Sequence, residues 1–127
     1  MDIEHFYIEK GRGFPLILLH GNGEDCDYFR GQIDEFSKQY HVYAIDTRGH
    51  GRTPRGDMPF TIRQFAGDLL EFMDEHQIEK AHLLGFSDGG NIAMVFALQN
   101  PGRIDRLILN GANLNADGVK QTTQLPI

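Results

Sequence analysis

Residues 85–90 read Gly-Phe-Ser-Asp-Gly-Gly and stand between two apolar stretches. Residues 81–85 are typical of a buried strand, and residues 91–99 carry the pattern of a helix that ends at Asn-Pro-Gly. A serine with glycines two positions before and after it, between a strand and a helix, predicts a sharp turn that holds the serine hydroxyl clear of the sheet. Such a turn is too crowded for bulky neighbours, and Gly85 and Gly89 have no side chain. The alternative interpretation is that Ser87 only caps the helix.

Strand and helix patterns alternate along the rest of the chain, which predicts a mostly parallel sheet covered by helices. At 127 residues the chain fits a single domain. We expect an α/β fold with about six strands and three helices. The strands include residues 3–9, 15–19, 41–45, 81–85 and 104–109, and the helices begin after Asp25 or Asp27, after Thr61, and at Asn91.

A second glycine-rich loop follows the wholly apolar strand 15–19 and reads His20-Gly21-Asn22-Gly23. A loop of this kind at the carboxyl end of a strand can turn a backbone N–H inward. The N–H of Asn22 would then face the same point as the N–H of Asp88 in the first turn of the next helix. Two such donors make an oxyanion hole.

A third segment, residues 46–53, leaves the strand 41–45 as Asp-Thr-Arg-Gly-His-Gly-Arg-Thr. The three segments, in this order and spacing, closely resemble the α/β-hydrolase superfamily. Esterase- and lipase-like members carry an HG-x-G loop, a D-x-RGHG-x-[ST] loop and a G-x-S-x-GG turn, and all three are present here. The resemblance covers essentially the whole chain.

The resemblance implies that Ser87 is the catalytic nucleophile, that the N–H groups of Asn22 and Asp88 form the oxyanion hole, and that Phe86 and Asn22 line the pocket. Serine at this position disfavours haloalkane dehalogenases and epoxide hydrolases, which use aspartate there. Hydrolysis of a carboxylic ester through an acyl-enzyme is the leading chemistry; lactones, thioesters, amides and C–C bonds next to carbonyls remain open. Several residues resemble structural positions of the family: His20, Asp46, Arg48, Gly49 and His50.

The family's catalytic triad runs serine, then an acid, then histidine along the chain. No histidine follows Ser87 among these 127 residues. We therefore expect the chain to be a truncated N-terminal portion of the fold that is inactive alone. It would lack the last two strands, the lid and the C-terminal helices, with residues 110–127 at the start of the lid region. The apolar strand 104–109 would then be left bare at the sheet edge and open to homodimer or swapped association.

Two other functions compete with this interpretation. Gly21, Gly23 and Cys26 come one residue short of the dinucleotide fingerprint G-x-G-x-x-G/A, and Asp46 stands near the place of a ribose-binding acid. Cys26 is too large for the third glycine position, and two acids lie beside the expected pyrophosphate. A non-catalytic binding scaffold is the other alternative, because the triad histidine is missing.

The composition of the chain argues against several other classes of protein. The net charge is −6 and no basic stripe is present, which disfavours nucleic acid as a partner. No apolar run is long enough to cross a membrane. The histidines lack metal-ligand spacing and Cys26 has no second cysteine to pair with, so we expect no metal and no cofactor. The single cysteine and a start without the pattern of a signal peptide point to the cytoplasm.

Overall fold

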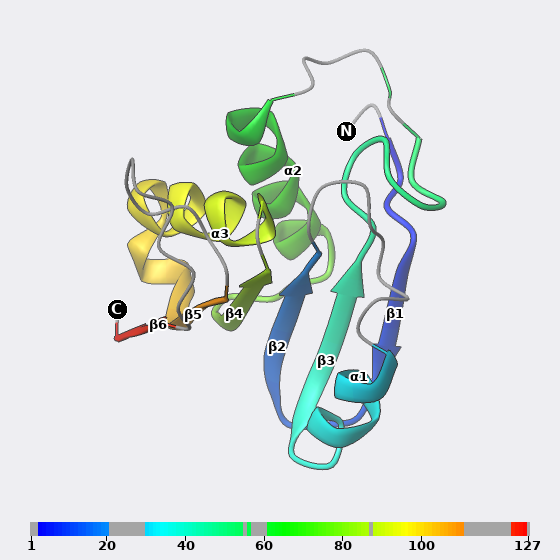
Figure 1. The fold of residues 1–127 in the computed structure, drawn as a ribbon, viewed down its shortest axis with the longest axis vertical. Helices are drawn as coiled ribbons and strands as arrows, with labels where there is room; N and C mark the ends of the chain where they lie inside the picture. The colour runs from blue at the N-terminus through cyan, green and yellow to red at the C-terminus, as the bar shows by residue number, and fades with distance from the viewer. Residues whose placement is uncertain are drawn as a thin grey trace.

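The computed structural model describes residues 3–20, 30–54, 56, 61–86, 88–110 and 123–126. These residues form one six-stranded sheet in the order β1-β3-β2-β4-β5-β6, with α1 on one face and α2 and α3 on the other (Figure 1). The predicted α/β class is confirmed. In chain order the elements are β1 (Tyr7–Lys10), β2 (Phe14–Leu19), α1 (Arg30–Phe36), β3 (Tyr40–Ile45), α2 (Ile62–Glu75), β4 (Ala81–Phe86), α3 (Asp88–Gln99), the 3₁₀ turn η2 (Pro101–Arg103), β5 (Ile104–Asn110) and β6 (Thr123–Pro126).

The four central strands β3, β2, β4 and β5 are parallel, and β1 and β6 run antiparallel to them at the two edges. Parallel strands need crossover connections: α1 lies in the connection from β2 to β3, α2 in that from β3 to β4, and α3 in that from β4 to β5. All carboxyl ends of the central strands therefore lie at one edge of the sheet.

Strand β2 shows why the sheet is buried on both faces. Ile17 and Leu19 pack into the larger apolar cluster beneath α2 and α3, whereas Leu16 and Leu18 pack into the smaller cluster beneath α1. Successive side chains of a strand point to opposite faces, so a strand covered on both sides must be apolar throughout. This confirms the prediction from residues 15–19.

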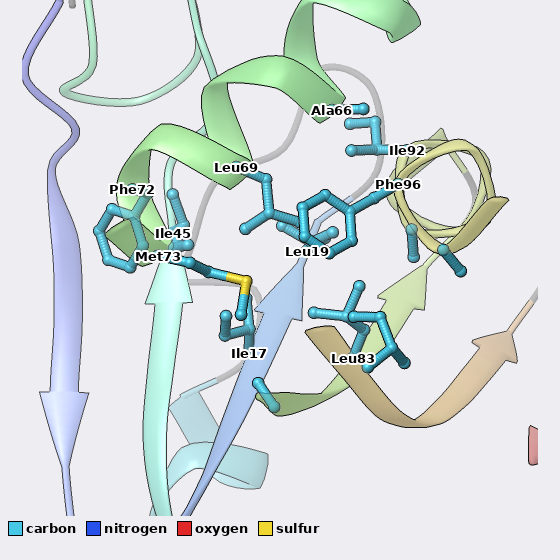
Figure 2. Packing of buried hydrophobic residues seen from close by; sticks show 14 of the residues in the cluster. Ile17, Leu19, Ile45, Ala66, Leu69, Phe72, Met73, Leu83, Ile92 and Phe96 are labelled. Carbon is cyan, nitrogen blue, oxygen red and sulfur yellow. The ribbon is translucent and has the colours of Figure 1, made fainter. Parts of the chain in front are cut away.

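Helix α2 begins where the sequence predicts. Thr61 is its N-cap, and the Thr61 hydroxyl accepts a hydrogen bond from the Gln64 N–H at 3.1 Å. Its apolar stripe meets the buried face of α3 and the strands below, as Figure 2 shows. The cluster includes Leu69, Phe72 and Met73 from α2, Ile92 and Phe96 from α3, and Ile17, Leu19, Ile45 and Leu83 from the sheet.

Helix α3 begins at Asp88, three residues before the predicted start at Asn91. The residues between are Asp-Gly-Gly, which have low helix propensity, so the apolar pattern begins only after them. Tertiary packing overrides that propensity here. The helix ends at Gln99, before the predicted Asn-Pro-Gly stop.

Strand β1 is shorter than the predicted strand 3–9. Its pairing with β3 starts at Tyr7, opposite Ile45, and β3 ends there. The preceding segment has no strand to pair with. Instead, the Phe6 N–H donates to the Thr53 hydroxyl at 2.9 Å and the Phe6 carbonyl accepts from the Asp46 N–H at 2.9 Å.

The expectation of a bare β5 edge is wrong. Residues 106–109 of β5 pair with β6, which returns antiparallel along it. The four residues of β6 include a proline and carry no alternating pattern, so they give no strand signal. Residues 111–122, where most of the predicted lid region falls, lie outside the described residues. Association between two chains stays a prediction.

Candidate active site

The three predicted functional loops begin at one edge of the sheet because of strand register. Leu19, the last residue of β2, is paired with Ile45 of β3 on one side and with Gly85 of β4 on the other. The segments that follow these residues, beginning at His20, Asp46 and Phe86, therefore start in one row. Ligand sites of parallel sheets lie at this carboxyl edge.

The turn from β4 to α3 is a single residue long. Strand β4 ends at Phe86 and α3 begins at Asp88. Ser87, the predicted nucleophile, is the residue between them and lies outside the described residues. The connection between β4 and α3 is therefore one residue long.

The two predicted glycines pack too tightly to carry side chains. A Cβ on Gly85 would lie 2.5 Å from the Gly90 Cα. A Cβ on Gly89 would lie 2.6 Å from the His20 carbonyl oxygen and closer still to that of Leu19. Both distances are far below van der Waals contact. The first turn of α3 is thus pressed against the end of β2, and only glycine permits this approach.

The other predicted site residues divide between the described and undescribed parts of the chain. Asp88 begins α3, so its backbone stands in the first turn of a 12-residue helix, where N–H groups lack intrahelical partners. Phe86 is half-buried and packs against the smaller apolar cluster beneath α1. Asn22 lies outside the described residues, as do Gly21, Gly23, Asp25, Asp27 and Cys26.

His20 is 2% exposed and is held by the loop after β3. The Thr47 N–H donates to His20 Nε2 at 3.0 Å, and Thr47 Oγ1 lies 3.2 Å from the same nitrogen. Thr47 Oγ1 is also 3.1 Å from Nδ1 of His50. The centroids of the His20 and His50 rings are 5.0 Å apart. Thr47 therefore links two histidines of the predicted motifs.

Asp46 organises the rest of that loop. Its carboxylate accepts from the Arg52 N–H at 2.8 Å, and its carbonyl accepts from the Thr53 hydroxyl at 2.7 Å. Gly49 and Gly51 have φ angles of 75° and 54°, which side chains rarely allow. These contacts give Asp46 and Gly49 the structural roles that the resemblance implied.

Arg48, in the same loop, is fully buried and pairs with Asp68, a residue outside the three sequence motifs. Its Nε and Nη2 donate to the two carboxylate oxygens of Asp68 at 2.9 and 2.8 Å. Gln64 Nε2 adds a third bond to Asp68 at 2.9 Å. The pair ties the loop after β3 to α2. An acid within the apolar stripe of α2 was the available signal, because a buried carboxylate requires a partner.

Two other described histidines, His82 and His5, have lowered pKa values. His82 stands near the start of β4, opposite Leu16, with its Nδ1 3.3 Å from an Asp105 carboxylate oxygen. Burial lowers the pKa of His82, partly offset by Asp105. Burial likewise lowers the pKa of His5, which also faces Asp68 and Arg48.

Two kinds of feature are absent from the described residues. None of their helices has the length and hydropathy needed to span a membrane. Their His, Cys, Asp and Glu side chains form no group of three with the arrangement of a metal site.

Comparison with known proteins gives relatives that include several hydrolases. The chain is 32% identical over 106 residues to the (E)-2-((N-methylformamido)methylene)succinate hydrolase of Acinetobacter baylyi, covering 83% of this chain and 40% of that protein. Among solved structures, an esterase of a marine microorganism matches with a TM-score of 0.82 at 34% identity, covering 86% of this chain and 42% of its own. A meta-cleavage product hydrolase from Pseudomonas fluorescens matches with a TM-score of 0.84 at 35% identity. The match covers 87% of this chain and 42% of that chain.

The chain thus spans less than half the length of these relatives. The family model of the alpha/beta hydrolase fold matches residues 15–125, which include all three predicted loops. Together with the strand order and the glycine-packed turn, this match shows that the chain belongs to the α/β-hydrolase fold family.

Proposed function

We propose that the protein is a serine hydrolase that cleaves a carboxylic ester or a related acyl substrate through an acyl-enzyme on Ser87. The observation that carries the proposal is the packing of Gly85 and Gly89, which leaves a one-residue turn at Ser87 between β4 and α3. A helix-capping serine requires no such packing. The relatives support the class, because their names include an esterase and two hydrolases.

The chemistry follows in two steps. The Ser87 oxygen attacks the substrate carbonyl carbon while a general base takes the hydroxyl proton, and the negative charge moves to the carbonyl oxygen. Collapse of this intermediate expels the alcohol, which leaves with a proton, and forms the acyl-enzyme. Water then attacks the same carbon, and the carboxylic acid leaves as Ser87 recovers its proton.

The proposed oxyanion donors are the backbone N–H groups of Asn22 and Asp88. The position of Asp88 in the first turn of α3 supports this role, because the helix dipole favours negative charge there. Asn22 follows two residues after His20, whose carbonyl oxygen abuts Gly89. We assign Asn22 and Phe86 to the pocket lining.

The general base and its acid partner are proposed to come from residues beyond these 127. No histidine follows Ser87 in the chain, and His20 Nε2 is already engaged by Thr47. An oxyanion hole without a base retains only about 10³-fold catalysis over water in other serine hydrolases. We therefore expect the 127-residue chain alone to be close to inactive. The proposal places the protein in the cytoplasm, in keeping with its single cysteine.

The test is ester turnover by the protein expressed from its complete reading frame. We expect hydrolysis of p-nitrophenyl acetate or butyrate, reduced about 10³-fold or more in Ser87→Ala. The chain has two serines, so Ser37→Ala is a matched control that should keep full activity. Wild-type activity in Ser87→Ala would contradict the proposal. Folded protein with no turnover of any acyl substrate would favour the non-catalytic scaffold.

A further inference from the structure

Residues 3–6, which precede β1, are bound to the loop that follows β3 without forming a strand. The Phe6 N–H donates to the Thr53 hydroxyl at 2.9 Å, and the Phe6 carbonyl oxygen accepts from the Asp46 N–H at 2.9 Å. Asp46 and Thr53 are the two ends of that loop, and the Thr53 hydroxyl donates in turn to the Asp46 carbonyl oxygen. The backbone of Phe6 therefore joins both ends of the loop. We call residues 3–6 the strap.

The side chains of the strap make few contacts with the rest of the fold. Of its four residues only Ile3 is buried, at 7% exposure. The Arg52 guanidinium lies over the Phe6 ring, 4.5 Å from its centroid. The His5 ring packs edge-on against Phe72 of α2, with the ring centroids 5.7 Å apart. A segment with few buried contacts and no strand pairing opens at a lower free energy than the core of the sheet.

His5 is the strap residue whose charge can change near neutral pH. Its ring lines a small cavity together with Arg48 and Asp68. The Asp68 carboxylate already accepts two hydrogen bonds from the Arg48 guanidinium, which compensates its charge. The charged and titratable groups that act on His5 are Asp68 and Glu75, which favour its protonated form, and Arg48 and His76, which disfavour it.

The docked strap favours a neutral His5. Burial lowers the pKa of His5 by more than Asp68 raises it, and Arg48 lowers the pKa further. An undocked strap exposes the ring to water, where its pKa returns to the ordinary value of about 6.5. Protonation therefore favours the undocked strap. The docking free energy is complete above about pH 6.5 and decreases as the pH falls from there towards the lowered pKa.

We propose that residues 3–6 are a pH-sensitive strap: protonation of His5 releases them from α2 and from the loop 46–53. That loop then loses both of its backbone hydrogen bonds to Phe6, at the sheet edge where the candidate active site lies. One proton moves from solvent to the imidazole, and no covalent bond breaks. The central sheet and the pair of Arg48 with Asp68 stay in place, so the change is a local opening. The inference goes beyond the proposed function and does not depend on it.

Amide hydrogen exchange in the protein expressed from its complete reading frame tests the strap. The Asp46 N–H is the reporter, because its acceptor is the Phe6 carbonyl oxygen. The Leu18 N–H is the reference for global unfolding, because β2 is paired on both sides and Leu18 is fully buried. After correction for the intrinsic pH dependence of exchange, we expect the opening constant at Asp46 to rise as the pH falls from about 7.5 to about 5. One proton limits this rise to about tenfold per pH unit. Leu18 should remain far more protected throughout.

Two variants separate the charge of His5 from its packing. His5→Gln and His5→Phe cannot be protonated, and His5→Phe keeps a ring against Phe72. In either folded variant we expect the opening constant at Asp46 to be nearly independent of pH. His82→Gln is the matched control, because burial also lowers the pKa of His82 in β4, and it should keep the wild-type pH dependence. Circular dichroism melts show which variants are folded, and either His5 variant alone carries the test.

The wild-type protein supplies a second readout. The rise at Asp46 should follow the pH range in which the His5 ring titrates, as measured by NMR. A wild-type opening constant at Asp46 that does not change with pH would overturn the inference, as would a rise outside that pH range. The wild-type pH dependence in a folded His5 variant would also overturn it. Equal opening constants at Asp46 and Leu18 would do the same, because they would mean that the whole fold opens rather than the strap.

Discussion

Gly89, in the first turn of α3, lies against the carbonyl oxygen of Leu19 at the end of β2, without room for a methyl group between them. The contact joins the strand before one predicted functional loop to the helix after another. Gly85 meets the backbone of Gly89 and Gly90 equally closely. The close approach of α3 to β2 and β4 therefore depends on glycines that face backbone atoms, which cannot rotate away as a side chain could.

Gly89→Ala should destabilise the protein by about 1–3 kcal/mol, the cost of overpacking a site that is already filled. Gly67→Ala is the matched control, because Gly67 lies within α2 with no atom within 4 Å of an added Cβ. That change should be neutral or stabilising by up to about 1 kcal/mol. Urea unfolding measures both, and equal effects of the two substitutions would contradict the packing described for the turn.

The buried ion pair gives a second prediction. Asp68→Asn removes the charge that compensates Arg48, and Arg48 is fully buried. Leaving one charge of a buried pair without its partner costs about 3–5 kcal/mol. Asp34→Asn is the control: Asp34 pairs with Lys10 on the surface at 2.6 Å, and solvent screens that pair. We expect no measurable change from the control. A loss below about 1 kcal/mol in Asp68→Asn would contradict the structural role of the pair.

Two histidines predict how stability depends on pH. The pKa of both His5 and His82 is lowered, chiefly by burial, so the unfolded chain takes up these protons first as pH falls. The free energy of unfolding should therefore decrease as pH drops below about 6.5, the ordinary histidine value, and level off below the lowered pKa values. Urea midpoints between pH 8 and 5 test this. A His5→Gln/His82→Gln double variant should show a shallower decline, and an unchanged slope would contradict the assignment.

The tautomer of His20 can be read directly. The bond from the Thr47 N–H requires a bare Nε2 and a protonated Nδ1. Long-range ¹H–¹⁵N correlation spectra at neutral pH should show this tautomer for His20. Protonation of Nε2 would be incompatible with the hydrogen bond from the Thr47 N–H and would contradict the described arrangement of the loop after β3.

Much of the fold could be predicted from local signals. The apolar run of residues 15–19 indicated a strand buried on both faces, and Thr61 marked the start of α2, because burial and capping leave direct traces in the sequence. β6 could not be predicted in this way. It has four residues and owes its pairing to β5. The early start of α3 was missed for a related reason, since Asp-Gly-Gly becomes helical only where the end of β2 packs against it.

The candidate site, too, could be predicted only in part from the sequence. The motifs brought out Ser87, Asn22 and Asp88 as chemical groups, because each has a required spacing from glycine. The residues that hold the neighbouring loop in place could not be predicted from the motifs. Thr47 and Asp68 act through partners 27 and 20 residues away in sequence. Such pairings depend on how the sheet edge and α2 meet in space.

The central claim is that Ser87 is an activated nucleophile, and modification by a fluorophosphonate tests it most directly. The protein expressed from its complete reading frame would be treated with the probe and analysed by intact mass and peptide mapping. We predict one adduct per chain on Ser87, unchanged in Ser37→Ala and absent in Ser87→Ala. An adduct that persists in Ser87→Ala, or folded wild-type protein that the probe leaves unmodified, would contradict the account.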